Sequence, residues 1–261
     1  MGKKSGIPIK NKQDIEKMRL AGKLAAELLV MIEPKVIPGV STLELNDIIH
    51  EYTTARGALS APLNYRGFPK SCCTSINNVV CHGIPSSKDI LKEGDIVNID
   101  VTVKLDGYHG DTSKTFFVGA VDPNIKSFVA RVEEAMYIGI KCVRPNQYFS
   151  EIGNRIHRFL KPFNHGIVRA LGGHGIGKNF HEDPFITHHK TGQRGERMKP
   201  GMIFTIEPMI NLSANYDVFI DANDKWTVFT KDNSLSAQFE HTVLVTDDGV
   251  EILTDRTGIK I

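Results

Sequence analysis

The chain has 261 residues, 41% of them hydrophobic and 24% charged, so it can bury a full core and does not belong to the intrinsically disordered class. Its net charge of +2 gives no strong field for nucleic acid, so we expect no specific DNA binding. It shows no secretory signal, no apolar run of about 18 residues and no disulfide framework, so we expect a protein of the reducing cytoplasm that does not enter membranes.

The first quarter of the chain predicts two helices. A lysine-rich arm of about ten residues comes first, and we expect it to be a frayed, solvated terminus. An apolar stripe then predicts an amphipathic helix over residues 12–32. Ser41 and Glu44 have the spacing of a capping box, which predicts a second helix over about 42–57. Loops and strands are expected over 58–85.

A β-hairpin is predicted next. An alternating run rich in Val and Ile at 95–105 precedes a two-residue Asp-Gly turn of type I′, and residues 108–118 return. This register places Asp100 and Asp111 diagonally on one face, with Cβ atoms roughly 7–8 Å apart at most. Two like charges on a half-buried face repel unless a cation lies between them. Two solvated acids on a hairpin would fit the pattern equally well.

Two more helices are expected after the hairpin. Asp122 and the proline after it predict the start of a helix that ends near Pro145. Ser150 is expected to cap a further helix over about 151–162. The order of helix, proline-containing turn, helix and strands thus occurs twice, with Pro38 in the first copy. This indicates two related α+β halves, with a ligand site at the seam between them.

Isolated ionisable residues stand in apolar or glycine-rich segments of the chain. His174 lies among the glycines of residues 172–177, a run that matches neither dinucleotide nor P-loop patterns. Glu207 ends an apolar strand, Glu240 interrupts a β-rich run, and His82 has apolar and turn neighbours. Each alone fits a structural histidine or an edge-strand charge. Together with the two hairpin aspartates they could balance two divalent cations, as in two-metal hydrolases.

Other hydrolase patterns have less support. His181 and the acid after it begin like a zinc-protease helix, but Phe185 replaces the second histidine and Pro184 would break the helix. His181 stays a candidate for stabilising an oxyanion. No serine-hydrolase elbow occurs, and Cys73 or Cys81 would need a partnered histidine to act as nucleophile, so both are predicted to be structural.

These segments together resemble the bacterial kind of type I methionine aminopeptidases, peptidase family M24, over about residues 8–255. The stretches that carry the resemblance are residues 75–77, 81–85, 98–102, 110–113, 173–177, 204–208 and 234–242. The resemblance implies the α/β (α+β) pita-bread fold, in which two pseudo-symmetric halves surround a curved antiparallel sheet. It also implies a single catalytic domain over 1–261, with an N-terminal arm of about 1–10.

The resemblance further implies a metalloaminopeptidase that removes the N-terminal methionine of nascent proteins, preferably before a small, uncharged second residue. The metal ligands it implies are Asp100, Asp111, His174, Glu207 and Glu240. A hydroxide held by two divalent ions would attack the scissile carbonyl. Glu207 would also shuttle the proton, His181 would stabilise the oxyanion, and His82 would contact the scissile amide. Cobalt, manganese, iron and zinc all suit this oxygen-rich set.

A methionine pocket is implied as well, built from Tyr65, Phe68, Cys73, Phe180 and Trp226. Pro62 and Phe68 depart from the residues frequent in the family, which leaves the methionine preference and changes the polarity of the pocket. Residues Asn77, Val79 and Ser236 match a family site for a monovalent cation, sodium or potassium. A monomer with transient ribosome contact is the expectation for this family.

Two alternatives stay open at this point. One is an X-Pro aminopeptidase or dipeptidase of the same fold, although such proteins usually carry an extra N-terminal domain. The other is a non-catalytic pita-bread protein that only binds a partner such as chromatin or ribosomal RNA. Relatives of that kind have generally lost the metal ligands, whereas this sequence retains all five.

Overall fold

The computed structural model describes residues 6–259, so the first half of the predicted arm, with its two lysines, lies outside the described residues. The four α-helices are α1 (Lys12–Ile32), α2 (Thr42–Ala55), α3 (Pro123–Ile140) and α4 (Ser150–Leu160). Short 3-10 turns occupy Glu33–Lys35, Tyr65–Gly67 and Lys161–Phe163. None of the helices in the described part of the chain is long and apolar enough to cross a membrane.

The strands form two larger and two smaller sheets, and every pairing between the described strands is antiparallel. In the first large sheet β4 (Ile96–Leu105) lies between β1 (Leu59–Ser60) and β2 (Cys73–Ile76), and β5 (Tyr108–Phe117) also pairs with β4. The second has the order β15 (Val250–Ile252), β14 (His241–Val245), β9 (Ile203–Ile206), β7 (Gly173–Gly175), β8 (Glu182–Ile186). One smaller sheet has the order β13 (Ser236–Gln238), β10 (Met209–Asn211), β6 (Gly166–Ile167). The other has the order β11 (Val218–Ile220), β12 (Val228–Thr230), β3 (Val79–Cys81).

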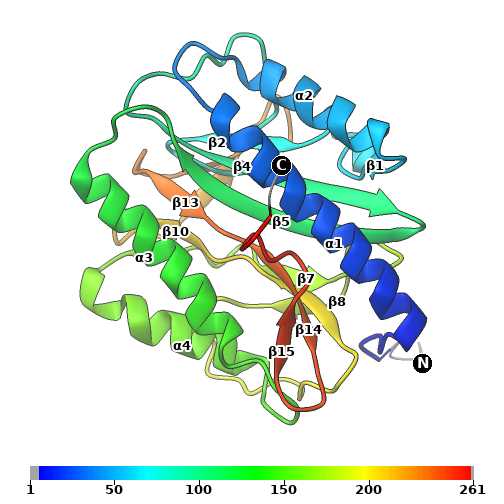
Figure 1. Ribbon diagram of the computed structural model, residues 1–261. Helices are drawn as coiled ribbons and strands as arrows, with labels where there is room; N and C mark the ends of the chain where they lie inside the picture. Colours follow the sequence, from blue (N-terminus) through cyan, green and yellow to red (C-terminus); the bar gives the residue numbers. More distant parts are fainter. Residues whose placement is uncertain (1–5, 260–261) are drawn as a thin grey trace.

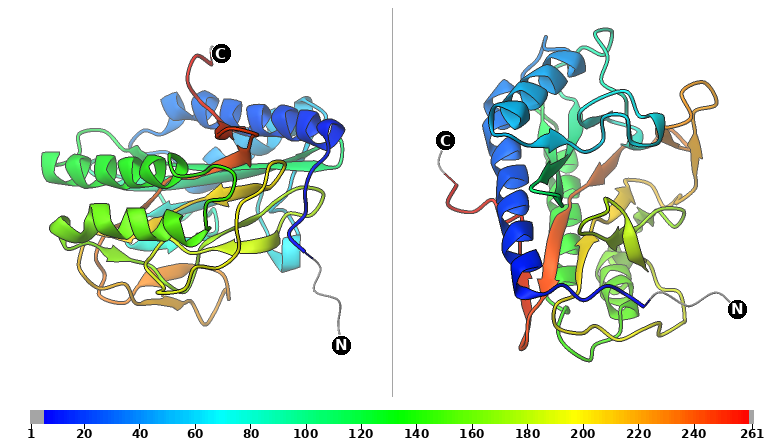
Figure 2. Two further views of the ribbon diagram at one scale, coloured as in Figure 1. Left: turned by 90° about the horizontal axis from the view of Figure 1, so that it is seen from below. Right: turned by 90° about the vertical axis from the view of Figure 1, so that its right-hand side faces the viewer.

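The helices divide between two halves of the molecule. Helix α1 runs across β4 and β5, and α3 and α4 lie side by side next to the second large sheet (Figure 1). Figure 2 shows the pair α1 and α2 and the pair α3 and α4 from below and from the right. Leu28 and Ile99 belong to a buried core beneath α1 and α2, whereas Phe128 and Phe204 belong to another beneath α3 and α4. The duplicated order of elements predicted from the sequence is therefore present in space.

Several predicted boundaries are confirmed. Helix α1 has the predicted limits, and both hydrogen bonds of the Ser41–Glu44 capping box start α2. The hairpin has the predicted two-residue turn, in which Asp106 and Gly107 have φ angles of 48° and 84°. Positive φ at both positions is the geometry that makes Asp-Gly favourable there. As a result, every cross-strand pair of β4 and β5 has the predicted register.

Two predicted helix ends are wrong. Helix α3 ends at Ile140 and not near Pro145, because the next residues tighten into a turn in which Val143 donates its backbone N–H to the Ile140 carbonyl at 2.9 Å. Ser150 is the first residue of α4 and makes no side-chain cap. Phe149 occupies the cap position, where its ring packs edge-on against Phe204 in the core, with ring centroids 5.1 Å apart.

The prediction of a frayed arm is also wrong for residues 6–10. Ile7 is half-buried against the core of the second half. The backbone N–H of Lys10 donates to the carbonyl of Gly201 at 2.8 Å, and its ammonium group forms an almost fully buried ion pair with Glu182. A buried lysine with a carboxylate partner fixes its segment of chain, because separating the two would leave each charge unpaired.

Close packing of α1 on β5 requires a glycine at position 110. A Cβ atom there would lie 2.4 Å from the carbonyl carbon of Ala21 and 2.5 Å from the nitrogen of Gly22. We expect Gly110→Ala to lower the free energy of unfolding by about 3 kcal/mol, measured by urea denaturation. In the matched control Gly249→Ala, the new methyl group would meet only Thr246 Oγ1, at 3.9 Å, and should change stability by less than about 0.5 kcal/mol. Equal stability of the two variants would contradict this account of the helix–sheet contact.

Candidate active site and metal centre

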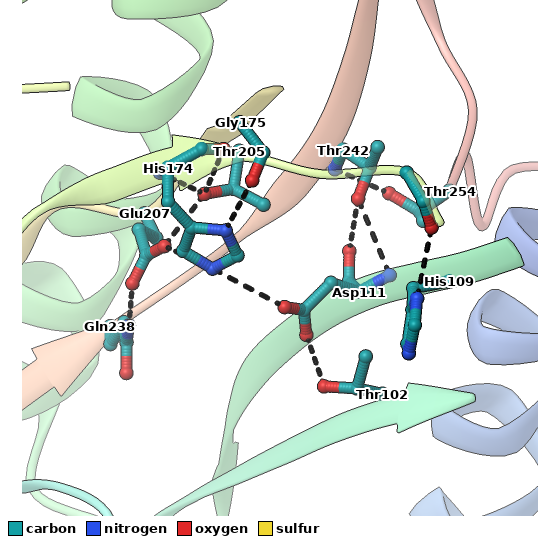
Figure 3. Close-up of polar contacts among 11 residues, drawn as sticks. Thr102, His109, Asp111, His174, Gly175, Thr205, Glu207, Gln238, Thr242 and Thr254 are labelled. Carbon is teal, nitrogen blue, oxygen red and sulfur yellow. Dashed lines mark hydrogen bonds and ion pairs between the residues drawn. The ribbon is translucent and has the colours of Figure 1, made fainter. Parts of the chain in front are cut away.

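The five predicted metal ligands line one cavity of about 280 Å³. They come from both halves: Asp100 on β4, Asp111 on β5, His174 on β7, Glu207 after β9, and Glu240 between β13 and β14. In Figure 3 the side chains of Asp111, His174 and Glu207 point toward one another across the gap between the sheets. Residues as far apart as 100 and 240 in the chain thus meet in one place.

The hairpin orients the two aspartates. Asp111 pairs with Thr102 and Asp100 with Ser113, so the two carboxylates are diagonal neighbours on one face, as predicted. The hydroxyl of Thr102 donates to Asp111 Oδ1 at 2.7 Å, which fixes the rotamer of that carboxylate and leaves Oδ2 free (Figure 3).

His174 is held at both its backbone and its ring. A Cβ at the neighbouring Gly173 would lie 2.3 Å from the Thr205 carbonyl oxygen, so only glycine permits this approach of β7 to β9. Since a carbonyl can only accept, Nδ1 of His174 carries the proton that is donated to Gly175 O at 2.9 Å. Nε2 therefore offers its lone pair, 3.6 Å from Asp111 Oδ2 and 3.8 Å from Glu207 Oε1. Those separations are too long for hydrogen bonds and leave room for an ion.

Both oxygens of Glu207 have a protein donor. The hydroxyl of Thr205 donates to Oε1 at 2.7 Å, and Nε2 of Gln238 donates to Oε2 at 3.3 Å. The backbone N–H of Glu207 donates to Nε2 of His188 at 3.1 Å. Burial lowers the pKa of His188 to about 3, which keeps its ring neutral and able to accept that bond. The carboxylate is thus oriented by two donors, and the backbone of Glu207 is held by a third contact.

Glu240 is positioned through its main chain. Its N–H donates to the carbonyl of Ser113 at 3.0 Å, and its own carbonyl accepts from the hydroxyl of Thr112 at 2.6 Å. Its carboxylate, Asp111 and His174 each offer one ligand atom, and these three atoms lie within 4.8 Å of one another. Donors bound to one ion at about 2.0–2.2 Å are separated by roughly 3–4.4 Å, so small side-chain movements would close the set around an ion.

The charge of this cluster calls for cations. Burial raises the pKa of Asp100 to about 7 and that of Glu207 to about 8. Burial, followed by the neighbouring carboxylates, raises the pKa of Asp111 and Glu240 well above the ordinary range. Among the described residues, no lysine or arginine forms an ion pair with any of the four. Three buried carboxylates, the partly exposed Asp100 and a neutral imidazole nitrogen are the donor set that two divalent cations would neutralise.

His82 and His181 also line the cavity. The ring of His181 lies 4.0 Å from that of His174, centroid to centroid, and burial, reinforced by His174, lowers its pKa to about 3. Burial lowers the pKa of His82 too. Both rings are therefore neutral near pH 7 and able to donate one N–H. Residues 182–186 form strand β8, which agrees with the rejection of a zinc-protease helix at this point.

One end of the cavity is aromatic. All of the predicted pocket residues line it, namely Tyr65, Phe68, Cys73, Phe180 and Trp226, and so does Pro62. Tyr65 and Phe180 lie 4.8 Å apart, and Phe68 meets Trp226 edge-on at 5.3 Å, centroid to centroid. Aromatic edges and a buried thiol make a pocket suited to an apolar, polarisable side chain.

The three residues predicted for a monovalent cation lie outside this cavity. The N–H of Ser236 donates to the carbonyl of Asn77 at 2.8 Å, and Val79 pairs with Phe229 across the small sheet. The left-handed backbone of Asn77, with φ of 52°, makes the turn between β2 and β3. A role in binding a cation stays a prediction.

Four residues that support the ligands were not predicted: Thr102, His188, Thr205 and Gln238. Thr102 was within reach of sequence reasoning, because the hairpin register already placed it opposite Asp111. His188 and Gln238 had no such signal, since their contacts with Glu207 depend on how three separate strands pack.

Comparison with known proteins agrees with this geometry. The sequence model of metallopeptidase family M24 matches residues 16–247 of the chain. Methionine aminopeptidase A of Synechocystis is 52% identical over 248 residues, covering 95% of this chain and 97% of that protein. Methionine aminopeptidase of Escherichia coli K12 is also 52% identical, over 251 residues, with coverage of 96% and 94%.

Solved structures give the same result for the fold. The crystal structure of methionine aminopeptidase from Rickettsia prowazekii superposes with a TM-score of 0.93 at 51% identity, covering 95% of this chain and 100% of that one. The fold is therefore the pita-bread α/β fold predicted from the sequence. X-Pro aminopeptidase from Thermotoga maritima shares the fold with a TM-score of 0.72, but at 19% identity and over 62% of its own length.

The raised carboxylate pKa values predict a pH dependence of metal-free protein. Asp100 and Glu207 hold protons in the folded state up to about pH 7 and 8, whereas in the unfolded chain they release them near pH 4. Raising the pH therefore favours the unfolded state, and these two groups alone should lower the free energy of unfolding by about 1–2 kcal/mol between pH 7 and 8, measured by urea denaturation. Buried His174 and His188, with pKa values lowered to about 4 and 3, are already neutral in this range. Saturating Mn²⁺ should abolish the loss, and a metal-free stability that is flat or rising over this range would contradict the assignment.

Cys73 is predicted to be unreactive although it lines the cavity. Burial, followed by the charge of Asp100, raises the pKa of its thiol well above the ordinary value. Because only the thiolate reacts, we expect no alkylation of the folded protein by iodoacetamide at pH 7.5, measured by mass spectrometry. The same protein in urea should be alkylated at all four cysteines. Rapid labelling of Cys73 in the folded state would revive the rejected cysteine-nucleophile alternative.

Proposed function

Since the chain belongs to metallopeptidase family M24, we propose that it acts as a methionine aminopeptidase on the N-terminal methionine of newly made proteins. The observation that carries this proposal is the joining, in one cavity, of an aromatic pocket and five inward-facing metal-binding groups. An enzyme that removes one terminal residue needs both a pocket for that side chain and a centre beside its peptide bond.

The proposed metal ligands are Asp100, Asp111, His174, Glu207 and Glu240. Two divalent cations, when bound there, supply Lewis-acid polarisation of the scissile carbonyl and lower the pKa of water in the site. Cobalt, manganese, iron and zinc are the candidates, because all accept carboxylate oxygen and imidazole nitrogen. Asn77, Val79 and Ser236 are proposed as a separate monovalent-cation site for sodium or potassium.

The residues around the centre have separate proposed roles. Glu207, oriented by Thr205 and Gln238, would take a proton from the attacking water and pass it to the leaving amine. The neutral ring of His181 would donate its N–H to the oxygen that becomes negative in the transition state. His82, T-shaped against Trp226 at 6.0 Å between ring centroids, would hold the scissile amide.

The aromatic pocket would determine which peptide bond is cleaved. A methionine side chain among Tyr65, Phe68, Cys73, Phe180 and Trp226 would place its own amine at the carboxylates, near Asp100. Because that amine must be free to lie there, only the first peptide bond would reach Glu207 and His181. A small, uncharged second residue is expected to fit best, as the resemblance to methionine aminopeptidases implies.

The proposal extends to the setting in which the protein works. We place it in the cytoplasm as a monomer that contacts ribosomes only transiently, because its proposed substrates are newly made chains. The X-Pro alternative has less support, because identity to such an enzyme is 19% and covers only 62% of it. A purely binding role has less support as well, because all five candidate ligands are present and inward-facing.

Hydrolysis of Met-Ala-Ser by metal-stripped protein tests the proposal. We expect methionine release only after Mn²⁺ or Co²⁺ is added back, measured by chromatography, and no release of glycine from a Gly-Pro peptide under any metal. Glu207→Gln should lower kcat by at least about 100-fold, because it removes both the proton shuttle and a ligand charge. Glu51→Gln, at an exposed position on α2, is the matched control and should retain full activity.

The outcomes separate the alternatives. Cleavage of the Gly-Pro peptide in preference to Met-Ala-Ser would indicate the X-Pro activity. Folded protein that binds Mn²⁺ in calorimetry and cleaves neither peptide would indicate the binding role. Full activity of Glu207→Gln would contradict the assignment of Glu207.

A further inference from the structure

The cavity has a second apolar wall that the proposed reaction leaves unused. Once the metal ligands, the two histidines and the methionine pocket are assigned, the apolar lining residues that remain are Ala170, Leu171, Phe185 and Met209, with Gly172 between them. They lie next to one another, because the ring of Phe185 on β8 packs over Gly172, and Leu171, the residue before it, packs against the cluster that contains Met209. Figure 1 shows β7 and β8 next to each other.

Phe185 is unusual on this wall because it is exposed. Its ring packs over Gly172, where a Cβ atom would lie 2.8 Å from Cζ of the phenylalanine. Even so, 58% of the residue is accessible to solvent. A single exposed phenylalanine is ordinary on a protein surface, but this one stands at the mouth of the proposed catalytic cavity. Its free face would lose contact with water when a substrate chain passes over it.

The rest of the wall is fixed from behind. Met209, which is only 4% exposed, belongs to a buried cluster with Val80, Val168 and Val228. Leu171 packs against the same cluster. A wall held in this way needs no ordering when a ligand binds, so contact with it contributes to affinity without an entropy cost for the protein.

The exposure of these residues orders the wall from the inside to the mouth. Buried Met209 lies deepest, half-buried Leu171 follows, and Phe185 is outermost. A substrate whose methionine fills the aromatic pocket has its third residue about 7 Å further along an extended chain. Its second residue would then meet the narrow inner part near Met209, and its third residue would reach the outer part.

We propose that Phe185 and Leu171 form a binding site for the side chain of the third residue of the substrate, with a preference for aliphatic or aromatic side chains over polar ones. This inference rests on the proposed aminopeptidase function. The favourable binding free energy comes from covering the exposed face of Phe185 and from removing an apolar substrate side chain from water. A serine or a charged side chain at that position makes neither contribution.

Paired peptides measure this preference. For the metal-loaded protein we expect kcat/KM for Met-Ala-Leu to exceed that for Met-Ala-Ser about fivefold, chiefly through a lower KM. Phe185→Thr should bring this ratio close to one, because threonine, like phenylalanine, is favoured in strands but lacks the apolar ring. Phe185→Leu should keep most of the ratio. The matched control Phe219→Thr, at a 49% exposed phenylalanine of β11 outside the cavity lining, should leave the ratio at its wild-type value.

The possible results distinguish failure of this inference from failure of the proposed function. Equal kcat/KM for the two peptides in the wild-type protein, or an unchanged ratio in Phe185→Thr, would overturn the inference while the proposed function stands. A fall of the ratio in Phe219→Thr as large as that in Phe185→Thr would also overturn it, since the effect would not be specific to the wall. Release of methionine from neither peptide would overturn the proposed function, and the inference with it.

Discussion

Four carboxylates that line one cavity are the constraint on which the rest of this structure depends. Burial raises their pKa values, and their proximity adds to this, so the fold holds them together at a cost that bound protons offset in the metal-free protein and that cations would offset in the metal-bound one. The residues around them hold the donor atoms in defined positions. A hairpin register, a glycine-backed histidine and two threonine hydroxyls fix where each donor atom points. The same groups that would be a liability in an apo protein become a preorganised centre when ions are present.

Local chemistry explains which parts of the fold could be predicted. An Asp-Gly turn permits positive φ at both residues, and once it is placed, strand alternation determines that Asp100 and Asp111 share a face. Long-range packing explains why the predictions for the N-terminal arm and for the cap of α4 were wrong. The partner of Lys10 lies 172 residues away, and Phe149 takes the cap position of α4 because its ring is needed in the core. The support of Glu207 by His188 and Gln238 depends on three strands meeting and left no pattern in the sequence.

The cavity is asymmetric in a way that gives a substrate a direction. Its aromatic end is closed in by Tyr65, Phe68 and Trp226, whereas its other apolar side leads outward past Met209 to Phe185. The lining carries charge of both signs, because Arg66 beside Tyr65 lines the same cavity as the four acids. Under the proposed aminopeptidase function, the free amine of the substrate would lie at the acids and the rest of its chain would leave along the apolar side.

The seam between the halves has a further consequence for incomplete copies of the protein. Asp111 and Thr242 exchange two hydrogen bonds across it, and the carboxylate of Glu240 lies beside that contact. A copy interrupted before residue 240 would retain all four helices and every strand of the first sheet, but it would lack one of the two acids that the second half contributes. If Glu240 is a metal ligand as proposed, truncation would yield an inactive fragment and not a partly active one, so an interrupted round of synthesis would release no unregulated peptidase.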